Sequence, residues 1–453
     1  MRRSWFWTAL FDVCLLIVAI TVAFWWRFGW PPPQPNLEPL PVVLPIVIVA
    51  LPLTFYGLGL YLRRPIKAIV RSAIYAEVLL FLIALAAAFW MRGFAFPRSV
   101  LLLAFAVHFV GALGWRLIVE ARTGKQRVAV VAPLSEATQI VQKLLHEPVG
   151  WYDIVRVLEP DQLLSDGISA LTGVELVVLG PSVVGDLRLE LLRIAVLANA
   201  RVYVMPEFRD ILIVGSVTTQ IGDTPVFEIR PLSLTTSQRI AKRAFDLLLA
   251  IPMLVLLSPI MLLTALIIKV SSPGPVLYAQ KRVGQYGKEF VLYKFRTMVV
   301  DAEKETGPVL ASARDPRVTP VGRFLRATRI DEIPQLINVI RGEMSLVGPR
   351  PERRFFVDQY CKETPDYDFR HLVLPGITGL AQVMGRYCTS VADKLRFDLY
   401  YIRHYSIWMD FKILLLTLQA VISKDGSQGI DTDDELRIAA RAEELVLGRA
   451  WKP

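Results

Sequence analysis

The sequence predicts a membrane protein in three parts. These are a membrane α-helical bundle of four spans (residues 1–120), a degenerate Rossmann-like α/β domain (residues 121–235), and an α-rich C-terminal domain (residues 236–453) with a re-entrant membrane helix at residues 245–270. Apolar residues make up 54% of the 453 residues and the mean hydropathy is +0.44, which is high for a soluble protein. Long apolar stretches come first, strand-like and helix-like segments then alternate, and one charge-free stretch follows.

Four apolar stretches near the N-terminus have the length of membrane-spanning helices, since a ~30 Å hydrocarbon core takes about 20 helical residues. They run from Phe6 to Trp26, Pro41 to Leu62, Ile74 to Met91, and Val100 to Ile118. The first is not a cleavable signal, because it is long and lacks a small-residue cleavage site. Tryptophans near its ends suit the membrane interface.

Basic residues in the short connecting segments predict the orientation of this bundle. One side carries Arg2, Arg3, Arg63, Arg64, Lys67, Arg71, Arg116, Arg122, Lys125 and Arg127, and the other carries Arg27, Arg92 and Arg98. The positive-inside rule therefore places both ends of the bundle in the cytoplasm.

The segment after Arg127 alternates strands and helices, as in a parallel α/β unit. Strand-like runs cover residues 128–131, 175–180 and 201–205, and helix-like runs cover residues 134–145 and 187–198. Ala132-Pro133-Leu134-Ser135 follows the first strand, where a dinucleotide site would have glycines for the pyrophosphate. We therefore expect a regulatory or assembly domain here.

Leu247 to Ile268 form 22 residues without a charge, long enough to span a membrane. Pro252 and Pro259 lie inside the stretch, and each removes a backbone donor and kinks a helix. The hydroxyl of Ser258 is placed to satisfy a carbonyl that Pro259 leaves without a donor. Basic residues flank both ends, which favours a re-entrant helix broken at Ser258-Pro259 over a fifth span.

The charge and the reactive residues exclude several classes of function. The net charge of +10 fits anionic lipid or phosphorylated substrates, whereas no long basic run or zinc-finger spacing points to nucleic acid. Three scattered cysteines and four scattered histidines favour neither a disulfide framework nor a histidine metal site. Tyr400 to Ile422 predict an interfacial amphipathic helix, and residues 431–449 a solvated one.

Adjacent carboxylates at Asp331-Glu332 precede Pro334, where a helix-like apolar pattern begins. Thr328 or Asp331 is placed to cap that helix. A carboxylate there, close to arginines, should stay ionised and suits nucleophilic attack on phosphorus. Taken alone, the pair is better explained as an ordinary acidic helix start, and the surrounding residues change this balance.

Cations interleaved with glycine and proline surround this acidic pair in the sequence. Lys294 and Arg296 stand two residues apart in a strand-like run, Arg326 precedes the pair, and Arg350 lies between Pro349 and Pro351. Arginine forks suit phosphate recognition, and a departing phosphate needs such neutralisation. These residues are the candidate substrate-binding set.

Four segments carry a resemblance: Lys294 to Met298, Asp331 to Leu336, Met344 to Pro351, and Pro375 to Gln382. Together they resemble the bacterial sugar transferase family, the polyprenyl-phosphate hexose-1-phosphate transferases or monotopic phosphoglycosyl transferases. The resemblance covers about residues 238–424, and the N-terminal parts resemble the long form of the family. Arg329-Ile330 before the acidic pair departs from the commonest family spelling.

The resemblance implies that residues 236–453 form a monotopic catalytic domain that moves a hexose-1-phosphate from a UDP-hexose to undecaprenyl phosphate and releases UMP. Asp331 matches the nucleophile that forms a covalent phosphosugar-aspartyl intermediate, and Glu332 matches its partner, a base or a Mg²⁺ ligand with Asp331. Lys294, Arg296, Arg326 and Arg350 match phosphate or nucleotide ligands. Asp398 fits the C-terminal pattern without an assigned role. The implied location is the bacterial inner membrane, multi-pass, with the catalytic domain on the cytoplasmic face.

Other functions remain open at this point. A non-catalytic membrane scaffold or regulator of polysaccharide export shares the helices but does not need Asp331-Glu332 beside fixed arginines. A nucleotide-sugar epimerase lacks its glycines and its Tyr-x-x-x-Lys signature here, and a processive glycosyltransferase would release UDP. Neither the transferred hexose, nor the polysaccharide pathway (exopolysaccharide, capsule or O-antigen), nor a homo-oligomer follows from the sequence.

Overall fold

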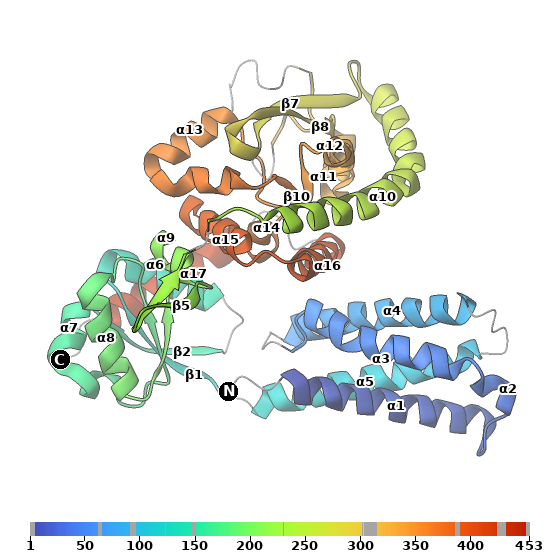
Figure 1. The fold of residues 1–453 in the computed structure, drawn as a ribbon, viewed down its shortest axis with the longest axis horizontal. Coiled ribbons are helices and arrows are strands. Elements are labelled where there is room, and N and C mark those ends of the chain that lie inside the picture. The colour runs from blue at the N-terminus through green and yellow to red at the C-terminus, as the bar shows by residue number, and fades with distance from the viewer. Residues whose placement is uncertain are drawn as a thin grey trace. The chain divides into compact units, whose positions relative to one another are not determined.

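The computed structural model describes residues 5–61, 66–90, 97–122, 124–146, 151–229, 231–300, 302, 315–385, 390–423 and 432–449. The described chain is mostly helical, with one four-stranded sheet and three two-stranded sheets (Figure 1).

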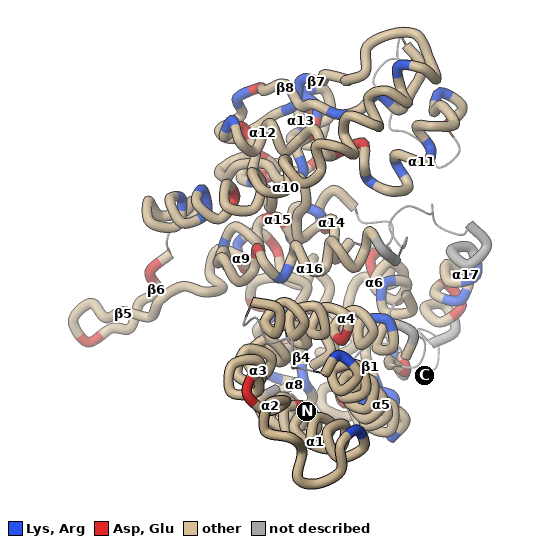
Figure 2. The backbone as a smooth tube through the Cα atoms, turned by 90° about the vertical axis from the view of Figure 1, so that its right-hand side faces the viewer, with Lys and Arg blue, Asp and Glu red and all other residues tan. Residues whose placement is uncertain are grey.

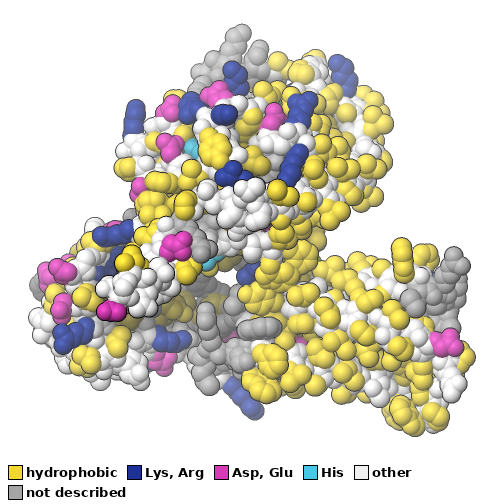
Figure 3. All heavy atoms as spheres, viewed as in Figure 1, with side chains coloured by type: hydrophobic (Ala, Val, Ile, Leu, Met, Phe, Trp, Pro, Cys, Tyr) yellow, Lys and Arg dark blue, Asp and Glu magenta, His cyan; other side chains and the backbone are white. Residues whose placement is uncertain are grey.

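The N-terminal helices are α1 (Trp5–Phe28), α2 (Gln34–Leu37), α3 (Leu40–Gly57), α4 (Ile66–Trp90) and α5 (Arg98–Arg122). α1 packs on α5, α3 on α4, and α4 on α5. Four of the five described helices that are long and apolar enough to cross a membrane lie here, and hydrophobic side chains cover most of the face of these helices that Figure 3 shows. The four apolar stretches are therefore helices, while their crossing of the membrane stays a prediction. Its orientation rests partly on Arg2, Arg3, Arg63, Arg64 and Arg92, which lie outside the described residues.

A buried polar network inside these helices was not predicted. Arg116 of α5 donates to both carboxylate oxygens of Asp12 of α1, at 3.0 and 2.7 Å. His108 of α5 lies 2.7 Å from Glu77 of α4 and 3.2 Å from the carbonyl of Asp12. Polar groups in an apolar bundle are costly unless paired, so these contacts fix which faces of α1, α4 and α5 meet.

The α/β part contains β1 (Gln126–Val131), α6 (Leu134–His146), β2 (Tyr152–Leu158), α7 (Pro160–Asp166), β3 (Leu176–Leu179), α8 (Gly185–Leu197) and β4 (Arg201–Val204). The strand order is β2-β1-β3-β4, and β1 and β2 run parallel. The predicted strands and helices are confirmed, whereas β2 was not predicted. α9 (Phe208–Ile213) and the hairpin β5 (Val217–Ile221) and β6 (Thr224–Glu228), visible in Figure 2, follow.

The C-terminal part begins with α10 (Thr236–Ser271), a helix of 36 residues that bends along its length (Figure 1). The hydroxyl of Thr235 accepts a hydrogen bond from the amide of Gln238 and completes a capping box. Pro259 leaves the carbonyl of Val255 without its helical donor, and the hydroxyl of Ser258 donates to that carbonyl at 2.7 Å. The predicted role of Ser258 is confirmed, and the break is a bend within one helix.

Both ends of α10 pack on the same C-terminal body, while its middle is mostly exposed. Near the start, Lys242 pairs with Asp410 at 2.7 Å, and Asp246 accepts hydrogen bonds from Ser345 and from the amide of Leu346. Near the end, Ile268 packs with Phe295 and Leu325. The helix is about 54 Å long at 1.5 Å per residue, so a straight course would separate these ends widely.

The remaining elements are short. They are β7 (Leu277–Val283), β8 (Glu289–Phe295), α11 (Pro320–Thr328), α12 (Gln335–Arg341), β9 (Ser345–Val347), α13 (Arg354–Glu363), β10 (Gly376–Thr378), α14 (Leu380–Met384), α15 (Val391–Arg403), α16 (Ile407–Ser423) and α17 (Thr432–Arg449), with short 3-10 turns η2 (Gln285–Gly287), η3 (Ile330–Glu332) and η4 (Pro365–Leu372). β7 and β8 are antiparallel, and β9 and β10 are parallel. A Cβ on Gly376 would collide with the backbone of Gly348, so both glycine-rich motifs meet backbone to backbone.

One predicted helix was wrong. Tyr400 to Ile422 are not one amphipathic helix, because α15 ends at Arg403 and α16 begins at Ile407. Tyr401, near the end of α15, is buried and donates to the carboxylate of Asp410 on α16 at 2.7 Å. This hydrogen bond ties the end of α15 to the first turn of α16, and a hydropathy pattern along the chain does not reveal it.

Candidate active site

Asp331 and Glu332 lie on the short turn η3, between α11 and α12. The prediction that they begin a helix capped by Thr328 or Asp331 is wrong. Thr328 ends α11 and donates to the carbonyl of Phe324 at 2.8 Å, and α12 starts at Gln335 with no side-chain cap. Arg329, just before the turn, has φ of +59°, a left-handed conformation that costs a non-glycine residue about 1 kcal/mol. The acidic pair is thus held on a strained turn.

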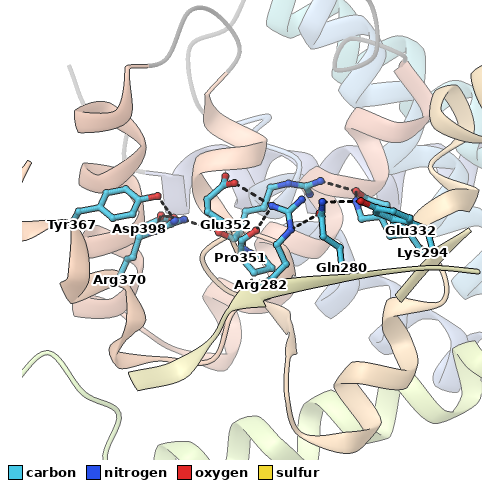
Figure 4. Close-up of polar contacts among 11 residues, drawn as sticks. Gln280, Arg282, Lys294, Glu332, Pro351, Glu352, Tyr367, Arg370 and Asp398 are labelled. Atoms are coloured by element: carbon cyan, nitrogen blue, oxygen red, sulfur yellow. Dashed lines mark hydrogen bonds and ion pairs between the residues drawn. The ribbon is translucent and has the colours of Figure 1, made fainter. Parts of the chain in front are cut away.

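Glu332 is a fixed anion between two cations. Its Oε1 accepts hydrogen bonds from Lys294 on β8 and from Arg350, each at 2.8 Å (Figure 4). Burial alone would raise the pKa of Glu332, but the charges of Arg350 and Lys294 outweigh it and hold that pKa well below its usual range. Glu332 therefore stays ionised and holds both cations in place.

Asp331 differs from its neighbour. Its side chain is 8% exposed, and burial, aided by the charge of Glu332, raises the pKa of Asp331 to about 6. Lys294, Arg326 and Arg329 oppose this shift without cancelling it. Within the described part of the chain, Oδ1 of Asp331 and Nε2 of Gln335 are buried and have no hydrogen-bond partner. Two such atoms, four residues apart, indicate a place where a polar ligand binds.

The raised pKa predicts how pH changes stability. Since the pKa of about 6 in the folded protein exceeds the ordinary value of 3.8 for an aspartate, protonated Asp331 favours folding below pH 4, and this contribution is lost as pH rises through 6. About two pKa units correspond to about 3 kcal/mol. In EDTA-treated protein, Asp331→Asn should therefore raise the unfolding temperature above pH 6 and change it little below pH 4. An equal gain at both pH values would contradict the raised pKa.

The other two predicted phosphate ligands, Arg296 and Arg326, have partners other than the acidic pair. Arg296 is buried and donates to the carbonyls of Pro273 and Ser272 and to the hydroxyl of Ser272, at 2.7 to 2.9 Å. These contacts hold the chain that leaves α10, and the assignment of Arg296 as a phosphate ligand stays a prediction. Arg326 donates through Nε to the hydroxyl of Thr297 at 2.9 Å, and its charge acts on Asp331.

A buried ion pair holds the backbone of Arg350 in place, and the sequence analysis did not predict it. Arg370 of η4 pairs with Asp398 of α15 at 2.8 Å, and donates to the hydroxyl of Tyr367 at 2.6 Å and to the carbonyl of Arg350 at 2.9 Å. Asp398 therefore helps to position the backbone of Arg350 by holding Arg370 in place. No local pattern could have revealed the pair, because its members are 28 residues apart.

A second arginine supports the other side of the same loop. Arg282 of β7 donates to the carbonyl of Pro351 at 3.1 Å and pairs with Glu352 at 3.3 Å, while Gln280 accepts from its Nε. Figure 4 shows these contacts continuing from Lys294 and Glu332 towards Arg370 and Asp398. The Pro349-Arg350-Pro351 loop is therefore held by two arginines while Arg350 itself reaches Glu332.

The set Asp331, Glu332, Lys294 and Arg350 combines one titratable buried carboxylate with a fixed anion and two cations. Such a set can attack an electrophilic phosphorus with Asp331 while the cations receive phosphate charge. Tertiary contacts reach this turn from β8 and from the loop after β9, and η4 in turn holds the backbone of that loop at Arg350. It is the candidate active site of the described chain.

Comparisons with known proteins show which proteins this chain resembles. Residues 237–424 match the family model described as bacterial sugar transferase. Similar proteins include a UDP-N-acetylgalactosamine-undecaprenyl-phosphate N-acetylgalactosaminephosphotransferase of Aeromonas hydrophila, 46% identical over 41% of this chain and 45% of its own length. Two proteins named UDP-glucose:undecaprenyl-phosphate glucose-1-phosphate transferase are also similar. That of Escherichia coli K12 is 43% identical over 48% of this chain and 48% of its own length, and that of Caulobacter vibrioides is 45% identical over 41% of this chain and 71% of its own. The matched segment spans about half the length of the first two relatives.

Proposed function

The chain belongs to the bacterial sugar transferase family, and on that premise we propose that it transfers a hexose-1-phosphate from a UDP-sugar to undecaprenyl phosphate and releases UMP. The product would begin a repeat unit of an exopolysaccharide, capsule or O-antigen. The relatives named above are transferases of this kind, which supports the reaction class.

One observation carries the proposal: the buried carboxylate of Asp331 stands beside a second carboxylate that two cations hold ionised. A membrane scaffold has no need for a strained turn, a raised carboxylate pKa and unpartnered buried polar atoms at one place. Strain and perturbed pKa values gather at functional sites. This set favours catalysis over the scaffold alternative.

In the first step, an oxygen of Asp331 attacks the sugar-bearing phosphorus of the UDP-sugar. The bond from that phosphorus to the oxygen bridging to UMP breaks, and UMP leaves with the electron pair. The product on the protein is an aspartyl phosphate ester-linked to the sugar. Lys294 and Arg350, aligned by Glu332, are placed to receive charge on the phosphates.

In the second step, an oxygen of undecaprenyl phosphate attacks the same phosphorus. The bond to Asp331 breaks, a diphosphate link forms between sugar and lipid, and the Asp331 carboxylate is regenerated. Glu332 remains ionised throughout because both cations stay close to it. The two steps use one nucleophile and one phosphate site in turn.

Mg²⁺ is part of the proposal. Asp331 and Glu332 would hold it. Oδ1 of Asp331 has no hydrogen-bond partner, so this oxygen is available to coordinate the ion. No group of three or more His, Cys, Asp or Glu side chains suited to a metal occurs in the described chain. That agrees with Mg²⁺ held by one or two carboxylates together with substrate phosphates. When bound, the ion would neutralise diphosphate charge.

The experiment that tests the function is nucleotide release from the purified, reconstituted protein. UDP-glucose, UDP-galactose and UDP-N-acetylgalactosamine are supplied with undecaprenyl phosphate and Mg²⁺. We expect UMP, with one sugar clearly preferred, and a stoichiometric amount of UMP when the acceptor lipid is left out. UDP in place of UMP, or no nucleotide from any sugar, would refute the proposal.

The topology of α10 belongs to the proposal, since a UDP-sugar is cytoplasmic and the acceptor lies in the membrane. Lys242 and Asp246 at one end, and Ile268 at the other, contact elements of the same C-terminal body. A span would place these ends on opposite sides of a ~30 Å core. We infer that α10 enters and leaves on one side, and that the catalytic domain faces the cytoplasm at the inner membrane.

Cysteine labelling checks this topology. In a background without Cys14, Cys361 and Cys388, single cysteines replace Arg239 and Lys288, exposed residues before and after the apolar part of α10. Both should react with a membrane-impermeant thiol reagent in inverted vesicles and neither in spheroplasts.

The control for labelling is Trp30→Cys, an exposed position after α1 that is predicted to face outward and should label in spheroplasts. Labelling of position 288 from outside, with position 239 protected, would mean that α10 spans the membrane.

A further inference from the structure

The helix α11 presents one face to the protein and another to its surroundings. Its buried face contains Gly322 and Leu325. A Cβ on Gly322 would collide with the backbone of Thr297, so the helix packs directly against that backbone. The opposite face carries Arg323 and Phe324, and Phe324 is 62% exposed. Figure 2 shows basic positions along this helix. An exposed aromatic ring beside arginine is the composition of a surface that meets lipid.

The position of α11 relative to α10 determines the depth at which this face would meet the membrane. Leu325 packs against Ile268, the last residue of the charge-free stretch of α10, just before Lys269. Val300 comes close to Gly274, which follows α10, and Val299 and Val300 are 52% and 53% exposed. Leu325 of α11 therefore lies beside the end of the apolar part of α10, and the exposed Val300 lies close to Gly274 just beyond it. That is the level of lipid headgroups if α10 is immersed.

The same helix leads directly to the acidic pair. α11 ends at Thr328, and the left-handed Arg329 turns the chain into η3 with Asp331. The charges of Arg326 and Arg329 both act on the Asp331 carboxyl, which places these cations around it. A path along the exposed side of α11 thus runs from apolar side chains, past arginines, to Asp331.

We propose that Arg323, Phe324 and Arg329 with Val299 and Val300, the α11 access face, receive the acceptor lipid. The prenyl chain lies against Phe324 and the two valines, and the phosphate travels along the arginines to Asp331. This rests on the proposed function and adds the route of its second substrate. A polyprenyl phosphate has an apolar chain and an anionic end, which match the apolar and basic side chains of the α11 access face. A UDP-sugar has no long apolar part.

The test separates the two half-reactions in the full chain, reconstituted in phosphatidylcholine vesicles. Phe324→Ser should leave the acceptor-free release of UMP unchanged and raise the KM for undecaprenyl phosphate by roughly tenfold, the scale expected from losing the apolar contact of one aromatic ring. With a short-chain prenyl phosphate in detergent the increase should be much smaller. Arg329→Gln should slow discharge of the phosphosugar-protein by both acceptors, because it acts on the phosphate.

The matched control is Phe355→Ser, an exposed phenylalanine on α13 with 57% of its surface accessible, which should leave both half-reactions unchanged. An unchanged acceptor KM in Phe324→Ser, with normal UMP release, would overturn the access face and leave the proposed function standing. An equal change for long and short acceptors would also overturn it. If the unmodified protein releases no UMP, the proposed function itself fails, and the inference fails with it.

Discussion

Asp331→Asn should reduce UMP release by roughly a thousandfold or more while leaving the protein folded in the membrane. An amide keeps the size of the side chain but cannot attack phosphorus as a carboxylate does. Because the buried carboxylate of Asp331 is unfavourable when ionised, its removal should stabilise the protein at neutral pH. Activity and thermal unfolding, measured on the same preparation, should move in opposite directions.

The control for this variant is Asp358→Asn, an exposed aspartate on α13, which should change neither quantity. Acceptor-free incubation with a radiolabelled UDP-sugar adds a direct readout, since the unmodified protein should retain label and Asp331→Asn should not. Retained label in the variant, or activity close to that of the unmodified protein, would rule out Asp331 as the nucleophile.

Asp398→Ala should be the most destabilising single change in the active-site support. It leaves Arg370 buried with an uncompensated charge, at a cost of about 3 to 5 kcal/mol. That is a large share of the 5 to 15 kcal/mol by which proteins are usually stable. The exposed pair of Arg354 and Glu289, 3.5 Å apart, gives the control: Glu289→Ala should cost less than about 1 kcal/mol.

A double variant separates the effect of the ion pair on stability from its effect on the position of Arg350. Asp398→Leu with Arg370→Met removes both charges, so stability should recover largely. Activity should stay low, because the hydrogen bond from Arg370 to the carbonyl of Arg350 is still missing. If the double variant regains both stability and activity, Arg370 does not position Arg350. If Asp398→Ala costs no stability, the ion pair does not have the buried geometry described.

Local patterns in the sequence predicted much of the fold. Apolar length marked α1, α3, α4, α5 and α10, and the combination of a serine with a following proline predicted the hydrogen bond from Ser258 to Val255. Rigid prolines around Arg350 predicted a fixed cation, and the structure pairs it with Glu332. These features depend on neighbours in sequence, where periodicity and backbone chemistry are decisive.

Features that depend on distant partners were missed or wrong. Arg296 and Lys294 look equivalent in sequence, yet Arg296 binds carbonyls at Ser272 and Pro273 while Lys294 binds Glu332. The caps expected at Thr328 or Asp331 failed because α11 ends there and a left-handed residue intervenes. The pairing of Arg370 with Asp398 depends on tertiary packing of η4 and α15. Which cation faces a ligand is decided by such packing.

The bend of α10 at Ser258-Pro259 has a mechanical consequence. If both ends of the helix stay on one side, its exposed apolar middle, with Val255, Leu256 and Leu262, displaces acyl chains from a single leaflet. That leaflet gains lateral area and the opposite one gains none. A helix inserted in this way is favoured where the membrane is convex on the side of the protein, because the lipids of that leaflet are loosely packed there. The shape of one helix would then tie the distribution of the protein in the cell to the local curvature of its membrane.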